Sequence, residues 1–300
     1  MIPRYSFSML GRNLDLVFKV LIYVFVLMLI CSALLVSIVN PILDALNSNI
    51  DISDRLLATL SDLINREHKN VFQQFIGDLN DVAESISSEI IIAVLLIIMV
   101  IFITKFFFAL TSVPIGELIY GRMSQNFSVK FHNVLVASLG KAFLYSLIHA
   151  LVTLVADALI VTIGYYLSKL LFAAIGAYGL SLAAFVFFGL MSARLALLGQ
   201  WVPQIVGEKK SVTKAFRDSF RYSVKYFWKV LPVHFLIMVI GFAVVALTTV
   251  FTFGLLPVIV MPIALVLVAN LNLVTYFTFN KRKFYVDEVT VINQIENDEE

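Results

Sequence analysis

Residues Val230 to Asn280 read VLPVHFLIMVIGFAVVALTTVFTFGLLPVIVMPIALVLVANLNLVTYFTFN, and these 51 residues include no Asp, Glu, Lys or Arg. A helix needs only about 20 apolar residues to cross a ~30 Å hydrocarbon core, so the run is too long for one span. A Phe-Gly pair at 253–254 and Pro257 interrupt it near the middle, and such punctuation favours a turn. We therefore expect two membrane-spanning helices with almost no loop between them, at 230–252 and 256–279.

The rest of the chain has the same character. Of its 300 residues 60% are hydrophobic and 14% are charged, against about 45–50% and about 25% in an average soluble domain. This composition excludes a soluble enzyme, a secreted disulfide scaffold and a disordered chain, and the one cysteine, Cys31, excludes an intrachain disulfide or a Cys-based metal site. Further apolar runs of spanning length occur at 16–39, 90–110, 142–167 and 170–198. We predict an all-α polytopic membrane protein, with six transmembrane helices in a single domain over 1–280 and only a tail over 281–300.

The few charges predict the orientation, because loops rich in Lys and Arg stay in the cytoplasm. Residues 44–89 hold nine acidic and three basic side chains, whereas 194–229 hold eight basic and two acidic ones. Residues 105–141 and the N-terminal stretch through Lys19 also carry a net positive charge. With six spans these signs agree, and they place both termini in the cytoplasm and the acidic segment outside an inner (plasma) membrane. The first apolar run has no cleavage site and should act as a signal anchor.

The acidic segment, at about 40–88, is the largest one predicted outside the membrane. Apolar residues recur there at helical spacing, with acidic residues on the opposite faces, which predicts two amphipathic helices. They form either an extracytoplasmic cap on the membrane surface or a docking site for other envelope proteins.

The predicted inner loops resemble each other. The sequence VPIGE at 113–117 follows the second span, and VPQIVGE at 202–208 follows the fourth. An amphipathic segment and an aromatic entry into the next span follow both motifs, and the N-terminus fits the same scheme more loosely. We predict a unit of one interfacial helix and one helical hairpin, present three times. Such repeats are common in membrane folds and indicate an architecture rather than an activity.

The second inner loop carries a resemblance to a known group. Its segments are RLALL (194–198), VPQIVGE (202–208), AFRDSF (215–220) and FWKVL (227–231). Together they are similar to a signature in the membrane domain of integral-membrane glycerophosphodiester phosphodiesterases and in related six-helix bacterial membrane proteins, YciC-like ones included. The resemblance implies a six-helix bacterial membrane protein. It does not imply phosphodiesterase activity, because that chemistry belongs to a separate soluble barrel of about 250 residues, for which this chain has no polar segment.

Residues 211–228 form the clearest amphipathic helix. One stripe is apolar at i, i+3, i+4 spacing, and basic residues surround it: Lys210, Lys214, Arg217, Arg221 and Lys225. A helix of this kind lies in the headgroup layer, where each cation near an anionic leaflet contributes about 1 kcal/mol. It is either a structural elbow on the inner surface or a binding surface for an anionic lipid or an acidic partner. Nothing in the chain suggests nucleic-acid binding.

Several polar residues fall within or beside the spans, where ionisable groups are costly and usually face protein or water. They are Lys105, Glu117, His149, Asp157, Arg194, Asn270 and Asn272. They are expected either to line a cytoplasm-facing polar cavity, with a proton relay between His149 and Asp157, or to make interhelical hydrogen bonds.

No catalytic, metal-binding or cofactor-binding motif is present, so we expect neither an enzyme nor a cofactor. The leading hypothesis is a non-enzymatic membrane protein of the bacterial envelope that organises lipids or partner proteins. The alternative is a transporter or channel for a small solute, lipid or amphiphile.

Overall fold

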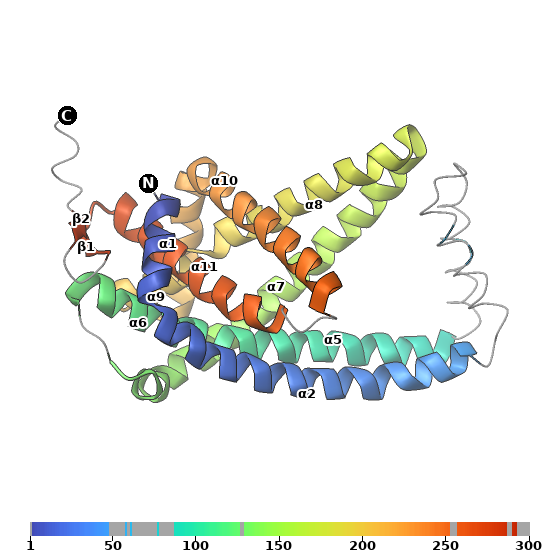
Figure 1. The fold of residues 1–300 in the computed structure, drawn as a ribbon, viewed down its shortest axis with the longest axis horizontal. Coiled ribbons are helices and arrows are strands. Elements are labelled where there is room, and N and C mark those ends of the chain that lie inside the picture. Colours follow the sequence, from blue (N-terminus) through green and yellow to red (C-terminus); the bar gives the residue numbers. More distant parts are fainter. Residues whose placement is uncertain are drawn as a thin grey trace. The chain divides into compact units, whose positions relative to one another are not determined.

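The computed structural model describes residues 2–47, 58, 61, 77, 87–126, 129–252, 257–286 and 290–292 (Figure 1). The helices are α1 (Ile2–Arg12), α2 (Leu14–Asn47), α5 (Ser87–Leu110), α6 (Ser112–Gln125), α7 (Phe131–Ile175), α8 (Ala177–Leu198), α9 (Trp201–Gly207), α10 (Val212–Thr252) and α11 (Pro257–Phe279). Two short strands, β1 (Phe284–Tyr285) and β2 (Val291–Ile292), pair antiparallel near the C-terminus. The cap predicted at 40–88 lies almost wholly outside the described residues.

Six helices are long and apolar enough to cross a membrane, and they confirm the all-α polytopic membrane fold. Large apolar side chains along them remain exposed, for example Ile22 at 68% and Leu247 at 62%. On a soluble protein such extended apolar surface would drive aggregation, whereas in a bilayer it faces lipid. The chain is therefore a multi-pass membrane protein.

Two of the predicted spans are parts of much longer helices. α7 has 45 residues and α10 has 41, which at 1.5 Å per residue is about 60 Å or more, twice the hydrocarbon core. The amphipathic helix predicted at 211–228 and the span predicted at 230–252 are therefore parts of one helix, α10. Pro232 lies inside α10, where its ring removes one backbone N–H from the helical ladder.

The chain divides into two compact units. Unit 1 comprises residues 1–28, 105–153 and 188–300, and unit 2 comprises 29–104 and 154–187. Unit 2 contains the C-terminal part of α2, most of α5, the C-terminal part of α7 and the first half of α8. The turn between α7 and α8 is so close that a Cβ on Gly179 would overlap the Leu171 carbonyl oxygen. Of the Lys and Arg residues that the structure describes, all but Lys169 belong to unit 1.

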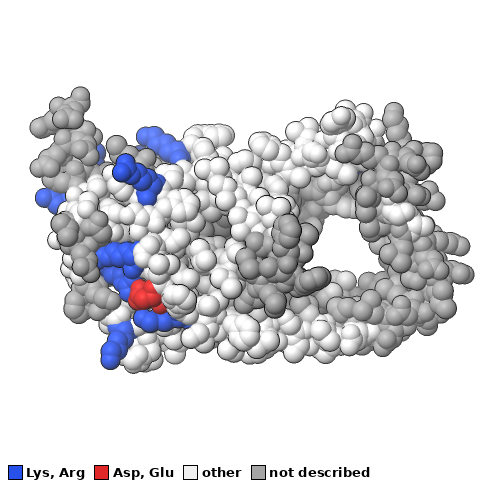
Figure 2. Space-filling model, viewed as in Figure 1, with Lys and Arg blue, Asp and Glu red and all other residues white. Residues whose placement is uncertain are grey.

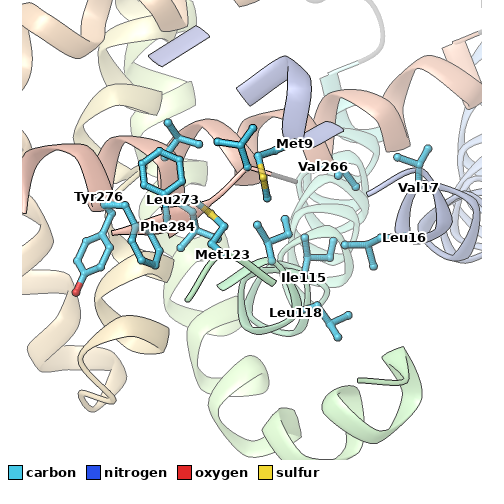
Figure 3. Packing of buried hydrophobic residues seen from close by; sticks show 14 of the residues in the cluster. Met9, Leu16, Val17, Ile115, Leu118, Met123, Val266, Leu273, Tyr276 and Phe284 are labelled. Carbon is cyan, nitrogen blue, oxygen red and sulfur yellow. The ribbon is translucent and has the colours of Figure 1, made fainter. Parts of the chain in front are cut away.

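Helix α11 is the centre of unit 1, where it contacts α1, α6, α9 and α10. In its most apolar window 44% of the residues are buried, against 17% or less in the other five spans. Figure 3 shows the core that results, with Met9 of α1, Ile115 of α6, Tyr276 of α11 and Phe284 of β1 packed together. The segments α1, α6 and β1, which are far apart in the sequence, therefore assemble against the same part of α11.

After residue 280, where we expect a tail, the described residues 284 and 286 pack into the core of unit 1. Phe284 is fully buried, and its ring lies 5.9 Å from Tyr5 and 5.7 Å from Phe277, centroid to centroid. Val286 is buried in the same core. The C-terminal hairpin is thus an integral part of unit 1, and α1, which lies where the first of the three interfacial helices was predicted, packs beside it.

Candidate functional site

The polar residues predicted inside the membrane do not all gather in one network. Asp157 belongs to unit 2, whereas the others belong to unit 1: Lys105, Glu117, His149, Arg194, Asn270 and Asn272. The two asparagines are two residues apart on α11, which is about 200° around the helix axis, so their side chains leave opposite faces. Each of them belongs to a different hydrogen-bond network.

Asn270 belongs to a buried network that ties α11 to the α1–α2 junction and to α6. Its Oδ1 accepts a hydrogen bond from Nδ2 of Asn13 at 3.0 Å, and Oδ1 of Asn13 accepts one from Nη1 of Arg122 at 2.7 Å. Arg122 also donates to both carboxylate oxygens of Asp15, at 2.8 and 2.7 Å. Arg122 is only 6% exposed, so its charge depends on this carboxylate. Neither Arg122 nor Asn13 is among the polar residues predicted from the sequence.

Asn272 belongs to a second network, which ties α11 to α10 and to the α8–α9 junction. Its side-chain oxygen lies 3.2 Å from Nε2 of His234, and its backbone carbonyl accepts a hydrogen bond from Gln200 at 3.1 Å. A Cβ on Gly199 would lie 2.6 Å from the Asn272 Oδ1, so only glycine permits this approach. Both asparagines therefore make interhelical hydrogen bonds, which was one of the two interpretations of these residues.

His149 lies in an aromatic cluster around Trp201. The His149 ring is 5.2 Å from the ring of Tyr145 and 6.1 Å from that of Trp201. Trp201 is fully buried, packs 4.6 Å from Phe216 of α10, and donates its indole N–H to the Val212 carbonyl at 2.9 Å. The cluster fixes the start of α10 against α9. Because Asp157 lies in unit 2, the proton relay stays a prediction.

Glu208, at the end of the second motif copy, is the centre of a third network that we did not predict. Its Oε1 accepts hydrogen bonds from the Tyr276 hydroxyl and, at 2.6 Å, from Arg282. The Tyr276 hydrogen bond and the charges of Arg282 and Lys210 hold the pKa of Glu208 below its usual value. Glu117, the corresponding residue of the first copy, has no side-chain hydrogen bond or ion pair within the described part of the chain.

The first half of α10 carries the predicted basic surface. Four of its five cations are exposed: Lys214, Arg217, Arg221 and Lys225. The fifth, Lys210, is held at 2.9 Å by both Gln204 and Asp218. Figure 2 shows Lys and Arg side chains gathered in the part of the view where Figure 1 places α1, α6 and α9.

An exposed apolar row lies beside these cations on α10. It consists of Phe220, Val224 and Trp228, and the Trp228 side chain is 80% exposed. We predicted Phe220 and Val224 on the same stripe as Ala215 and Ser219, but that stripe is divided, because Ala215 and Ser219 are buried. We call the exposed rows, Arg217, Arg221 and Lys225 with Phe220, Val224 and Trp228, the α10 ridge.

No family model, curated protein or solved structure matches this chain. Among the described residues no group of three or more His, Cys, Asp and Glu side chains is placed to hold a metal ion. Function is therefore inferred from the chain's own side chains.

Proposed function

We propose that the chain is a non-enzymatic membrane protein of the bacterial cell envelope that binds anionic lipids along the α10 ridge and so organises the lipid around it. One observation carries this proposal: a row of exposed cations runs beside a row of exposed apolar side chains on one face of α10. A helix with both rows fits the headgroup layer, where the cations meet phosphates and the apolar side chains meet acyl chains.

The placement of the ridge in the headgroup layer requires α10 to bend where it enters the hydrocarbon core, and Pro232, just after the ridge, lies at that point. Residues 230–252 span about 34 Å, which is enough to cross the hydrocarbon core. Residues 212–229 extend this helix by about 27 Å. An indole as exposed as that of Trp228 is unfavourable in water but is favoured at the level of the headgroups.

The same proposal includes a topology. The basic ridge belongs to the unit in which α1, α6 and the C-terminal hairpin pack together. Because basic segments stay in the cytoplasm, we place both ends of the chain there and the protein in the inner (plasma) membrane. The order of a short helix followed by two long ones occurs as α1-α2-α5, α6-α7-α8 and α9-α10-α11. This order and the resemblance of 194–231 to six-helix bacterial membrane proteins support a threefold repeat.

The two tryptophans of the chain allow a direct test. Trp228 is exposed on the ridge and Trp201 is buried, so brominated acyl chains should quench Trp228 alone. In vesicles of fixed composition, bromine on the anionic lipid should quench the protein more than bromine on the zwitterionic lipid.

Replacing the four exposed cations by Gln should make the two kinds of quenching equal; the four are Lys214, Arg217, Arg221 and Lys225. The matched control replaces two other exposed lysines, Lys130 just before α7 and Lys141 on α7, and should leave the difference intact. Trp228→Phe gives the background of Trp201. Equal quenching by both lipids in the unaltered protein would contradict the proposal.

The alternative function, a transporter or channel, is favoured by two buried polar atoms. Asn270 Nδ2 and Gln200 Oε1 have no hydrogen-bond partner within the described residues, and such atoms are satisfied by water or a polar solute. Solute flux into reconstituted liposomes, with Asp157→Asn as the variant, tests this alternative. Absence of flux under every gradient would contradict it.

A further inference from the structure

We propose that the α10 ridge selects a phospholipid with two phosphate groups, a diphosphatidyl lipid, over phospholipids with one. This inference rests on the proposed function and specifies the class of lipid that the ridge binds. The juxtaposition that carries it is that of Arg217 and Arg221 on successive turns of α10, each with an exposed apolar residue three positions further on.

The two arginines are placed to bind two phosphates at once. Residues four apart lie one above the other on a helix, with a rise of about 6 Å. A guanidinium binds phosphate through two parallel hydrogen bonds, which a lysine ammonium does not do. Two guanidinium groups one turn apart therefore match two phosphates that a short linker holds together.

No carboxylate in the described chain forms an ion pair with either arginine. Asp218, the acidic residue between them in sequence, pairs with Lys210 at 2.9 Å. Lys210 is further fixed by Gln204, at 2.9 Å. Lys210 thus holds the carboxylate by a direct ion pair. The charge of Arg221 acts on it only at longer range, so both arginines keep their hydrogen-bonding capacity for a ligand.

The apolar row extends the match to the acyl chains. Phe220 and Val224 follow Arg217 and Arg221 by three residues, a spacing that places each pair on one face of the helix. With Trp228 the apolar row covers about 12 Å of helix. Each turn therefore offers a cation beside an apolar side chain, so a lipid with four acyl chains covers more of the row than a lipid with two.

The test uses native mass spectrometry of the full chain, delipidated in detergent. It is titrated with a diphosphatidyl lipid or with a one-phosphate anionic lipid at equal phosphate concentration. We expect the diphosphatidyl lipid to bind about tenfold more tightly than the one-phosphate lipid, since one additional charge-assisted contact is worth about that factor.

The deciding variant is Arg217→Lys with Arg221→Lys, which keeps the charge and removes the bidentate geometry. We expect the preference to fall to about twofold, while binding of the one-phosphate lipid hardly changes. Arg4→Lys, at an exposed site on α1, is the matched control and should keep the full preference.

The outcomes separate this inference from the proposed function. Equal binding of both lipids by the unaltered chain, or a preference that survives both Arg→Lys changes, would overturn the selection alone. If neutralising all four exposed cations left the binding of both lipids unchanged, this result would contradict the proposed function as well. Inorganic pyrophosphate tests a soluble source of the same chemistry. It should not displace the lipid at equal phosphate, and displacement would overturn the assignment to a lipid.

Discussion

Helices α6 and α9 carry the same short motif and pack on each other, yet side chains of opposite charge anchor them. α6 is tied to the α1–α2 junction through Arg122, which is almost fully buried. α9 is tied to α11 and to the C-terminal segment through Glu208, whose side chain is 33% exposed. The motif thus predicts the position of a helix, whereas the burial of the segments around that helix decides which side chain anchors it.

The largest effect is expected in the α6 anchor. Asp15→Asn leaves the Arg122 guanidinium buried without a carboxylate, and we expect a loss of about 2–4 kcal/mol in the free energy of unfolding, below the fully buried case because Asp15 is half exposed. Arg122→Met leaves the half-exposed Asp15 to be hydrated, so its loss should be smaller, about 1–2 kcal/mol.

Unfolding by sodium dodecyl sulfate in mixed micelles measures both losses. Lys19→Gln is the control, because it removes only the exposed Lys19–Asp15 pair at 3.3 Å and should cost less than about 1 kcal/mol. A larger loss for Arg122→Met than for Asp15→Asn would show that the buried charge is not what makes the α6 anchor strong.

An intermediate effect is expected at the glycine that precedes the glutamate in each copy. A Cβ on Gly207 would lie 2.8 Å from the Tyr276 hydroxyl oxygen and 2.9 Å from ring carbons of that buried residue. Gly207→Ala should therefore cost about 1–3 kcal/mol. A Cβ on Gly116 would lie 2.5 Å from Cγ1 of Val202 and 3.5 Å from Cγ2 of Val206. Because Val202 is only half buried and has more room to move than the fully buried Tyr276 ring, Gly116→Ala should cost less.

The same unfolding measurement ranks these variants, with Gly140→Ala as the control. A Cβ on Gly140 meets nothing within 4 Å, so alanine there should be neutral or stabilise α7 by up to about 1 kcal/mol. Equal losses of unfolding free energy for Gly116→Ala and Gly207→Ala would contradict the tighter packing expected at Gly207.

The smallest effect is the pH dependence of the α9 anchor. The folded-state pKa of Glu208 lies below its usual 4.5. The carboxylate therefore contributes stability that is fully present above the unfolded pKa and is lost as pH falls through the folded pKa. Because Glu208 is one-third exposed, the contribution should stay below about 1 kcal/mol.

Hydrogen exchange at the Val286 amide, which donates to the Thr290 carbonyl at 3.0 Å, reports on this anchor. Near neutral pH the unaltered protein should exchange more slowly there than Glu208→Gln, and the difference should vanish in acid. Glu117→Gln should exchange like the unaltered protein throughout. The comparison between α6 and α9 would be broken if both Glu→Gln changes had the same effect.

The spans could be predicted from the sequence because lipid imposes a minimum apolar length that no other part of the chain reaches. The opposite directions of Asn270 and Asn272 also follow from helical geometry, at 100° per residue, although one of the two interpretations placed both in one cavity. The length of α10 was harder to predict, since amphipathic and spanning parts can be continuous or separated by a bend. The division of its apolar stripe depends on packing against α9 and α11.

The polar anchors could not be predicted, because each joins residues remote in sequence. Arg122 meets Asp15 and Asn13 only after α6 has packed against the α1–α2 junction. Phe284 lies in a short apolar stretch within a polar segment. A stretch this short does not predict whether its side chains are buried. In both cases burial is a tertiary property that local spacing does not contain.

The contact between Tyr5 and Phe284 also has a consequence for how the protein is made. Helix α1 cannot bury its aromatic face until Phe284 of β1 has been synthesised, since β1 supplies part of that surface. Until then the apolar side chains of α1 and α6 that belong to this core stay exposed outside the spans, and such surfaces favour aggregation. Completion of this core is thus a late step of biogenesis, and insertion of all six spans can precede it.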